Sequence, residues 1–201
     1  MKKIIVLILL ICAENVKAQS GLQIGAEISP SWKLLLHKSK TTSIRSSESG
    51  FGFTAGIPVK YWLSEYTSFN TGLNYIFSSY DVIANNVFIS TTRFNTVQIP
   101  LSFNINLKAD WYGIVGTGVD YNFISRTRFG GIRSDISPII NKVQPFLTLG
   151  VNNLRETDNG FFEIGLQARY QLLNLNNSNS IVFDNTSSHV LSLDVLMRFY
   201  I

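Results

Sequence analysis

The sequence predicts an all-β fold: a single, eight-stranded, antiparallel, up-and-down transmembrane β-barrel. Three observations lead to this prediction. Apolar residues alternate with small or polar residues in eight segments, most of them longer than an ordinary globular strand. The connections between these segments are alternately short and long. Finally, only 15% of the residues are charged while 45% are hydrophobic, whereas soluble domains have roughly 25% charged residues.

The N-terminus has the pattern of a secretory signal. Lys2 and Lys3 precede ten apolar residues, 4–13, and a small-x-small cleavage site ends at Ala18. Ten residues are too few for a helix to cross the membrane, so we predict a signal peptide over 1–18 and a barrel domain over 19–201. The domain then holds 14 basic and 12 acidic residues and lacks the single cysteine, Cys12. Thiol catalysis and cysteine-bound metal are therefore excluded.

The first four segments each have one apolar face. Residues 22–32 alternate Leu, Ile, Ala and Trp with Gln, Gly, Glu and Ser, and residues 51–61 alternate Phe, Ala, Ile, Val and Tyr with Gly, Thr, Pro and Lys. Residues 69–77 set Phe, Thr, Leu and Tyr against Ser, Asn and Gly. In residues 97–107, six apolar residues alternate without a break with Gln, Pro, Ser and Asn. A period of two predicts a strand in each.

The last four segments follow the same rule. Residues 115–123 alternate Val, Thr, Tyr and Phe with Gly, Asp and Asn, and residues 143–151 place Val and Leu opposite Gln, Thr and Gly. Residues 162–172 alternate Phe, Ile, Leu, Ala and Tyr with Glu, Gly, Gln and Arg. Residues 191–201 set Leu, Val, Met, Phe and Ile against Ser, Asp and Arg. These lengths suit tilted membrane-spanning strands, which need roughly 9–11 residues.

Short and long connections alternate along the chain. The short ones are 63–66, 108–111 and 153–160, and the long polar ones are 33–49, 78–92, 125–142 and 174–189. Short turns at one end and long loops at the other are typical of outer-membrane barrels, whose termini lie on the periplasmic side. A barrel of ten strands stays an alternative if residues 125–142 contain a further hairpin.

Backbone hydrogen bonding explains why such strands form a closed barrel. Each unpaired N–H or C=O in hydrocarbon costs several kcal/mol, so the sheet has to close and leave no edge. The apolar set then faces lipid, and the other set faces a lumen that side chains just fill in an eight-stranded barrel. Glycines are common in that second set, where space is smallest: Gly25, Gly52, Gly56, Gly72, Gly116, Gly118, Gly150 and Gly165.

The set that faces the lumen also carries seven charged residues: Glu27, Lys60, Asp120, Glu163, Arg169, Asp194 and Arg198. The lipid-facing set has essentially none, as expected where Arg or Lys at the bilayer midplane costs roughly 2–4 kcal/mol. Confined together, these groups are expected to pair in a structural network that plugs the barrel. A polar pore or proton path through the same residues is the alternative. Aromatic residues near the strand ends suit interfacial girdles: Trp32, Tyr61, Trp62, Tyr66, Trp111, Tyr112 and Tyr170.

A soluble, lipocalin-like barrel in the periplasm is the opposite interpretation. It would turn the apolar face inward around a ligand and leave the polar face in water, and alternation alone does not distinguish the two. An aromatic-rich face on every strand, with bare glycines opposite, favours the membrane barrel.

Catalytic residues are not expected. Outer-membrane enzymes that modify lipid need a His, a Ser and an acid at the barrel rim. The chain has only His37 and His189, both placed in predicted outer loops, with Asp184, Ser187 and Ser188 near the second. Neighbours in a flexible loop rarely hold the geometry that a nucleophile and its base require. No metal-ligand spacing and no phosphate-binding loop before a helix occur either.

Three motifs resemble a known family. The segments Gly50-Phe51-Gly52-Phe53-Thr54-Ala55-Gly56-Ile57-Pro58-Val59, Asn70-Thr71-Gly72-Leu73-Asn74-Tyr75 and Val97-Gln98-Ile99-Pro100-Leu101 are similar to strands of PorT-like, "porin family" outer-membrane barrels. The resemblance covers nearly the whole chain after residue 18 and implies the barrel and its location, since family members share no single activity. The C-terminal strand resembles a barrel-assembly signal, except that Tyr200 and Ile201 follow Phe199.

We therefore expect an integral barrel of the Gram-negative outer membrane that is not an enzyme and binds no cofactor or metal. Its polar lumen is plugged, and its long outer loops serve structural or partner-binding roles. Expected partners are outer-membrane lipid, the barrel-assembly machinery through the C-terminal strand, and an external or secretion-machinery protein. Nucleic acid is not expected, because no basic run follows a phosphate backbone. A rim-active lipid-modifying enzyme, a narrow passive pore and the soluble carrier are the alternatives.

Overall fold

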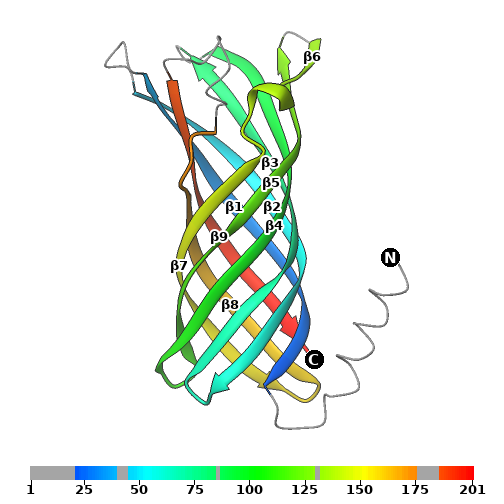
Figure 1. Cartoon of the computed structure of the whole chain (residues 1–201), viewed down its shortest axis with the longest axis vertical. Helices are drawn as coiled ribbons and strands as arrows, with labels where there is room; N and C mark the ends of the chain where they lie inside the picture. The colour runs from blue at the N-terminus through cyan, green and yellow to red at the C-terminus, as the bar shows by residue number, and fades with distance from the viewer. Residues whose placement is uncertain (1–20, 40–44, 85–86, 130–131, 176–185) are drawn as a thin grey trace, which may run out of the picture.

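Long antiparallel strands make up most of the described chain. The computed structural model describes residues 21–39, 45–84, 87–129, 132–175 and 186–201. Eight long strands run up and down between the two ends of the molecule (Figure 1): β1 (Leu22–Ser39), β2 (Arg45–Ser64), β3 (Thr67–Ala84), β4 (Val87–Lys108), β5 (Trp111–Phe129), β7 (Val143–Thr157), β8 (Gly160–Gln171) and β9 (Thr186–Tyr200). A short strand, β6 (Ile132–Asp135), and a 3₁₀ turn, η1 (Ser137–Ile139), follow β5. Among these residues no helix is long and apolar enough to cross a membrane.

The eight long strands close into a ring. Successive strands pair along the chain, β5 pairs with β7, and β1 pairs with β9 to complete the circle. The closing register runs from Gly25 opposite Tyr200 to Ser39 opposite Thr186. Beyond it, Ile24 and Ile201 exchange both backbone hydrogen bonds, with N···O distances of 3.4 and 3.0 Å. The predicted eight-stranded, up-and-down antiparallel barrel is confirmed.

The additional hairpin considered for residues 125–142 exists but adds no strand to the ring. Strand β6 pairs only with the last residues of β5, from Arg126 opposite Asp135 to Phe129 opposite Ile132. Strand β7 does not pair with this part of β5, because the last pair between β5 and β7 is Tyr121 with Val143. The hairpin therefore projects beyond the ring, at the end of the barrel opposite the C-terminus (Figure 1). A ten-stranded ring is wrong for this chain.

The apolar face of each strand points outward. Side chains such as Ile57, Leu73 and Leu149 are 58%, 56% and 64% exposed, while the Ser, Asn, Gln and charged residues between such positions are mostly buried. A continuous apolar outer wall around a polar interior fits lipid and would be very unfavourable in water. The soluble barrel with an apolar interior is therefore wrong.

The strands are longer than the alternating segments, so the predicted long loops are partly wrong. Residues 33–39 and 45–49 extend β1 and β2, and residues 78–84 and 87–92 extend β3 and β4. The apolar–polar alternation weakens there, although the backbone pairing continues. His37 and His189 consequently lie in β1 and β9 rather than in loops.

Two of the predicted lumen glycines show how narrow the interior is. A Cβ on Gly116 would lie 2.5 Å from the carbonyl oxygen of Leu101 and equally close to Cβ of Ser102. A Cβ on Gly118 would meet the ring of Phe146. The bare backbone at these positions leaves space for side chains from neighbouring strands, as expected for a barrel of this size.

Candidate functional site

The lumen contains all seven charged residues that the sequence predicts there. Glu27, Lys60, Asp120, Glu163, Arg169, Asp194 and Arg198 are each at most 6% exposed. They come from five of the eight strands of the ring, β1, β2, β5, β8 and β9, and each occupies an inward position of its strand. The structure separates them into two clusters along the barrel axis, one near the short turns and one nearer the outer end.

The inner cluster lies near the short turns and joins four charged residues and one amide. Lys60 Nζ donates to Glu163 Oε2 at 2.6 Å, and Arg198 Nη1 lies 3.3 Å from the other oxygen of Glu163. Arg198 Nε also donates to Glu27 Oε2 at 2.7 Å. Asn152 donates to Glu163 Oε1. The cluster therefore ties β1, β2, β7, β8 and β9 together across the lumen.

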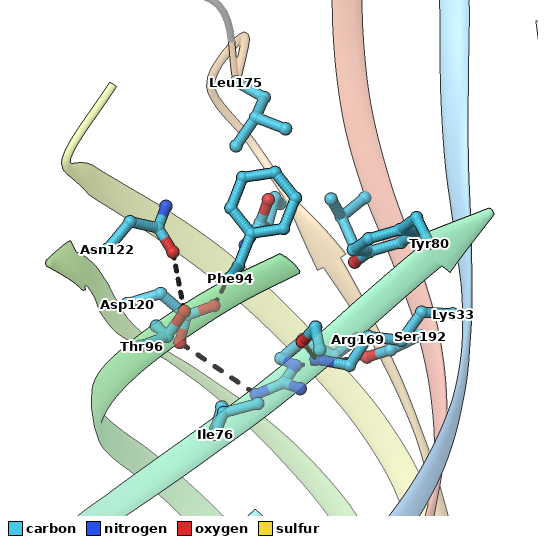
Figure 2. Close-up of a pocket in the computed structure, with 13 residues that line it drawn as sticks. Lys33, Ile76, Tyr80, Phe94, Thr96, Asp120, Asn122, Arg169, Leu175 and Ser192 are labelled. Carbon is cyan, nitrogen blue, oxygen red and sulfur yellow. Dashed lines mark hydrogen bonds and ion pairs between the residues drawn. The ribbon is translucent and has the colours of Figure 1, made fainter. Parts of the chain in front are cut away.

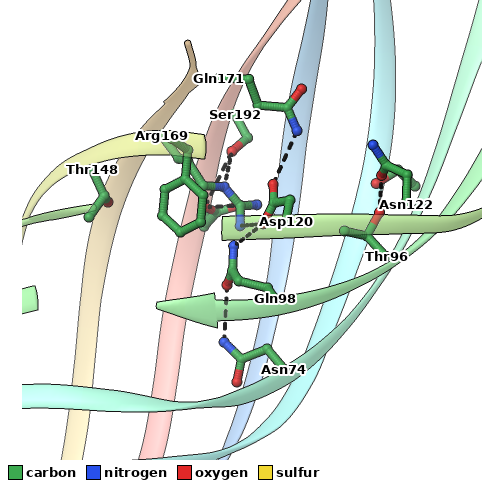
Figure 3. A network of polar contacts seen from close by, with 12 residues as sticks. Asn74, Thr96, Gln98, Asp120, Asn122, Thr148, Arg169, Gln171 and Ser192 are labelled. Carbon is green, nitrogen blue, oxygen red and sulfur yellow. Dashed lines mark hydrogen bonds and ion pairs between the residues drawn. The ribbon is translucent and has the colours of Figure 1, made fainter. Parts of the chain in front are cut away.

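The outer cluster is centred on Arg169. Its Nη2 lies 3.6 Å from Asp194 Oδ2, its Nη1 lies 4.0 Å from Asp120 Oδ1, and its Nε donates to Ser192 at 3.2 Å. Amide side chains extend the cluster toward β3 and β4 (Figure 3): Gln98 donates to Asp120 at 2.8 Å, and Asn74 donates to Gln98 at 3.1 Å. This second network connects strands from opposite sides of the ring.

Lys33 is a further lumen cation, beyond the seven charged residues that the sequence predicts there. It is 4% exposed, and its ammonium donates to Ser78 Oγ at 2.6 Å. It also lines a small cavity together with Arg169 and Asp120. The apolar alternation of the first segment ends at Trp32, so the sequence predicts Lys33 in a loop. Lys33 nevertheless follows residues 27, 29 and 31 on the inward side of the strand, and extending their alternation by one position identifies it.

Including Lys33, the lumen charges balance within each cluster. The inner cluster has Lys60 and Arg198 against Glu27 and Glu163, and the outer one has Lys33 and Arg169 against Asp120 and Asp194. Burying an unpaired charge is strongly unfavourable, whereas paired and hydrogen-bonded charges are tolerated. The two neutral clusters are therefore suited to bracing the barrel wall from within.

Apolar side chains also point into the lumen. Leu196, Ile76, Ile114 and Phe146 point inward and are at most 3% exposed. The Arg169 guanidinium lies 5.4 Å from the centre of the Phe146 ring. The sequence pattern does not reveal these residues, because Leu196 and Phe146 interrupt the polar phase of their strands. They fill lumen space beside the charged clusters.

Aromatic residues fill the end of the lumen near the short turns. Tyr200 is fully buried, with its ring centre 4.5 Å from Lys60 Nζ. Trp62 and Tyr112 meet edge to face, 5.9 Å apart. The prediction that Trp62 and Tyr112 belong to the outer girdle is wrong, because both occupy inward positions at the strand ends. The other girdle residues are exposed on the outer wall: Trp32, Tyr61, Tyr66, Trp111 and Tyr170.

A cluster of buried apolar side chains closes the outer end of the lumen. We call this cluster the apolar cap; it consists of Leu35, Tyr80, Phe94, Ile140, Leu175 and Val190, with Ile136 packed against them. Figure 2 shows Tyr80, Phe94 and Leu175 above the polar side chains of Asp120 and Arg169. Residues 136, 140 and 175 come from the described parts of the connections after β6 and β8, and these residues pack inward over the lumen.

The cavity between the apolar cap and Arg169 is very small. Its volume is about 20 Å³, enough for roughly one water molecule. Pockets for small-molecule ligands are typically about 300–1,000 Å³. Among the described residues, this cavity is therefore too small for a carried ligand.

The structure describes only part of the candidate catalytic group at His189. The His189 ring stacks on Tyr170, with ring centres 5.7 Å apart, and its Nδ1 lies 3.3 Å from the Gln171 carbonyl oxygen. Ser188 points into the lumen, on the opposite face of β9 from His189. Asp184 and the side chain of His37 lie outside the described residues. Among the described side chains, no group of His, Cys, Asp or Glu could hold a metal ion.

Comparison with known proteins gives one family match. Residues 17–180 match the family described as "Outer membrane protein beta-barrel domain". Comparison with curated protein sequences gives no match.

Solved structures of small barrels resemble this one at low sequence identity. Neisserial surface protein A is 12% identical, with 87% of this chain and 96% of that chain covered and a TM-score of 0.49. Outer membrane protein OprG of Pseudomonas aeruginosa is 11% identical (90% and 98% covered, TM-score 0.42). Ail, the attachment invasion locus protein of Yersinia pestis, is 14% identical (90% and 100% covered, TM-score 0.38). With TM-scores below 0.5, these likenesses support no assignment of function.

Proposed function

Because the chain belongs to the outer-membrane protein β-barrel domain family, we propose that it is a sealed, non-conducting barrel without enzymatic activity. The observation that carries this proposal is the filling of the lumen along its whole length. Aromatic side chains, two neutral charge clusters, inward apolar side chains and the apolar cap all occupy the lumen. An ion would have to displace paired side chains at two levels to pass.

The role proposed for the molecule is to hold a surface above the membrane. Strands β1 to β5 contain 18 to 22 residues, about twice the number needed to span a bilayer, whereas β8 contains 12. The additional residues of these strands lie at the end of the barrel where the long connections are. The hairpins β1–β2, β3–β4 and β5–β6 therefore extend beyond the rest of the barrel on one side, and we call this extension the raised wall. A rigid paired wall is well suited to bind an external protein or a component of secretion machinery.

The same proposal includes a subgroup within the family and a partner for the last strand. The motifs in residues 50–59, 70–75 and 97–101 favour a PorT-like member within the family. The exposed, alternating side chains of Phe199 and Ile201 at the seam favour recognition of β9 by the barrel-assembly machinery.

Single-channel recording tests the sealed lumen. The purified, refolded protein would be inserted into planar bilayers and compared with an open porin of known conductance. We expect no steady channel from the native protein. Steady conductance that changes in Arg169→Ala would instead identify a passive pore. In parallel, lipid extracted from cells that express the protein should be unmodified, and a modification lost in His189→Ala would identify a rim-active enzyme.

A further inference from the structure

Four arginines gather on the outside of the raised wall, away from the lumen. Arg93 lies on β4, Arg126 and Arg128 lie on β5, and Arg133 lies on β6. All four side chains are exposed, and together they line a groove of about 230 Å³. We call this feature the arginine groove. It is independent of the residues that fill the lumen.

The arrangement places like charges directly opposite one another. Arg93 faces Arg126 across β4 and β5, and Arg128 faces Arg133 across β5 and β6. Like charges at directly opposed positions of an antiparallel pair are destabilising. In the described part of the chain, no carboxylate lies within ion-pair distance of any of the four. Two such pairs side by side therefore form a site that an anion would stabilise.

Two carboxylates lie near the arginine groove without neutralising it. Asp81 on β3 accepts a hydrogen bond from Thr91 Oγ1 at 2.9 Å. Asp135 lies opposite Arg126, and hydrogen bonds from the Ser137 side chain and backbone, with a smaller contribution from the charge of Arg126, hold the pKa of Asp135 below its usual value. Asp135 is therefore a carboxylate at neutral pH. Four positive charges against two negative ones leave the groove with an excess of positive charge.

The arginine groove begins where the apolar belt ends. Phe77 and Asn95 line its lower part, and these two residues lie opposite each other on β3 and β4. Phe77 belongs to the outward apolar face, and Phe123 is the last aromatic residue of that face on β5, three residues before Arg126. A molecule bound at the arginines would therefore have hydrocarbon directly beneath it.

We propose that the arginine groove binds the phosphate groups of a phosphorylated lipid in the outer leaflet. Guanidinium groups bind phosphate through paired hydrogen bonds, which makes arginine the side chain best matched to this group. The acyl chains of such a lipid would lie against the apolar wall below Phe77. A free anion would match the arginines but would leave this apolar surface unused, so the position of the groove favours the lipid.

Native mass spectrometry of the full barrel in detergent tests the proposal. The probe is purified diphosphorylated lipid A, and the matched probe is the same lipid after enzymatic removal of its phosphates. The test variant is Arg93→Gln/Arg126→Gln. A second variant, Arg128→Gln/Arg133→Gln, changes the hairpin beyond the ring. The control is Arg155→Gln, because Arg155 is an exposed arginine near the short turn between β7 and β8, at the other end of the barrel. Heat-dependent gel mobility confirms that each variant is folded.

We expect the native protein and the Arg155→Gln control to bind the phosphorylated lipid with equal affinity. Each double variant should bind it about tenfold or more weakly, because hydrogen-bonded contacts between charged groups are removed. Removal of the phosphates should weaken binding to the native protein to a similar extent. Equal binding of both lipids, or unchanged binding by both double variants, would overturn the proposal. Displacement by an equal concentration of inorganic phosphate would also overturn it, in favour of a site for free anions.

Discussion

Arg198 and Glu27 are 171 residues apart in the sequence, yet their side chains meet across the seam that closes the barrel, with Nε 2.7 Å from Oε2. They lie directly opposite each other on β9 and β1. On its other side, Arg198 lies opposite Glu163 of β8. One guanidinium therefore links the last strand to both of its neighbours, inside the lumen where water is scarce.

Replacement of Arg198 should weaken the folded barrel more than replacement of an exposed arginine. Arg198→Ala leaves Glu27 without its ion-pair partner and removes one partner of Glu163. Breaking a buried pair by removing one partner typically costs about 3–5 kcal/mol. The measurement is the temperature at which the compact, unheated form converts to the unfolded form on a gel. Arg155→Ala, near the short turn between β7 and β8, should leave that temperature unchanged, and equal effects of the two changes would contradict the role given to Arg198.

Lys60 and Glu163 should be energetically coupled. Glu163→Gln leaves Lys60 buried, 1% exposed, without a carboxylate. A further change, Lys60→Met, removes that unpaired charge, so the double variant should be more stable than Glu163→Gln alone. Coupling between side chains in one buried network is typically about 0.5–3 kcal/mol. A denaturant-based double-mutant cycle in detergent measures it, and strictly additive losses would refute the coupling.

The small residue at Gly118 should be required for packing. Gly118→Val would push side-chain atoms into the ring of Phe146 and the Ile99 carbonyl oxygen, 2.5 Å from an added Cβ. Such overpacking costs roughly 1–3 kcal/mol. Gly113 is the matched control on the same strand, because it faces outward and its nearest neighbour is the flexible end of Leu107, 3.4 Å from an added Cβ. Thermal midpoints should fall for Gly118→Val and not for Gly113→Val.

A charge on the outer wall should disturb insertion. Leu149 is 64% exposed in the apolar run of β7. Leu149→Arg should destabilise the inserted barrel by about 2–4 kcal/mol if the residue lies near the bilayer midplane. Leu149→Ile keeps the apolar surface and is the control. The measurement is the fraction folded after refolding into lipid vesicles, and equal yields for both variants would mean that this face does not contact hydrocarbon.

The sequence predicts the ring well because one face of each membrane-spanning segment has to be apolar. The eight segments and their inward charges, including Glu163 and Arg198, follow from that single requirement. The pattern ends where hydrocarbon ends, so the extension of β1 to Ser39, the position of Lys33 and the raised wall could not be read from it. The strands stay paired in those extensions because they continue the register of the alternating segments in the same hairpins.

Aromatic and apolar residues that face inward were harder to predict. Trp62, Tyr112 and Leu196 are as hydrophobic as residues on the lipid face, and composition does not distinguish the two sides. Their orientation depends on the strand phase at the barrel ends, where the register between β2 and β3 also shifts, between Trp62 and Ser64. The apolar cap depends on connections folding inward, which alternation in strands does not describe.

Disulfide formation across the seam tests most directly whether β1 and β9 close the barrel in the membrane. Ala26 and Phe199 are directly opposite each other on the outward phase, and opposed residues of antiparallel strands have Cα atoms about 4.5–5.5 Å apart, within the range of a disulfide. A chain with Ala26→Cys and Phe199→Cys, oxidised in isolated outer membranes, should form an intramolecular bond that changes its mobility on a non-reducing gel after boiling. Ala26→Cys with Leu149→Cys on β7 should not. If the seam pair failed to form a bond, or both pairs formed one equally, the closed eight-stranded ring would be contradicted.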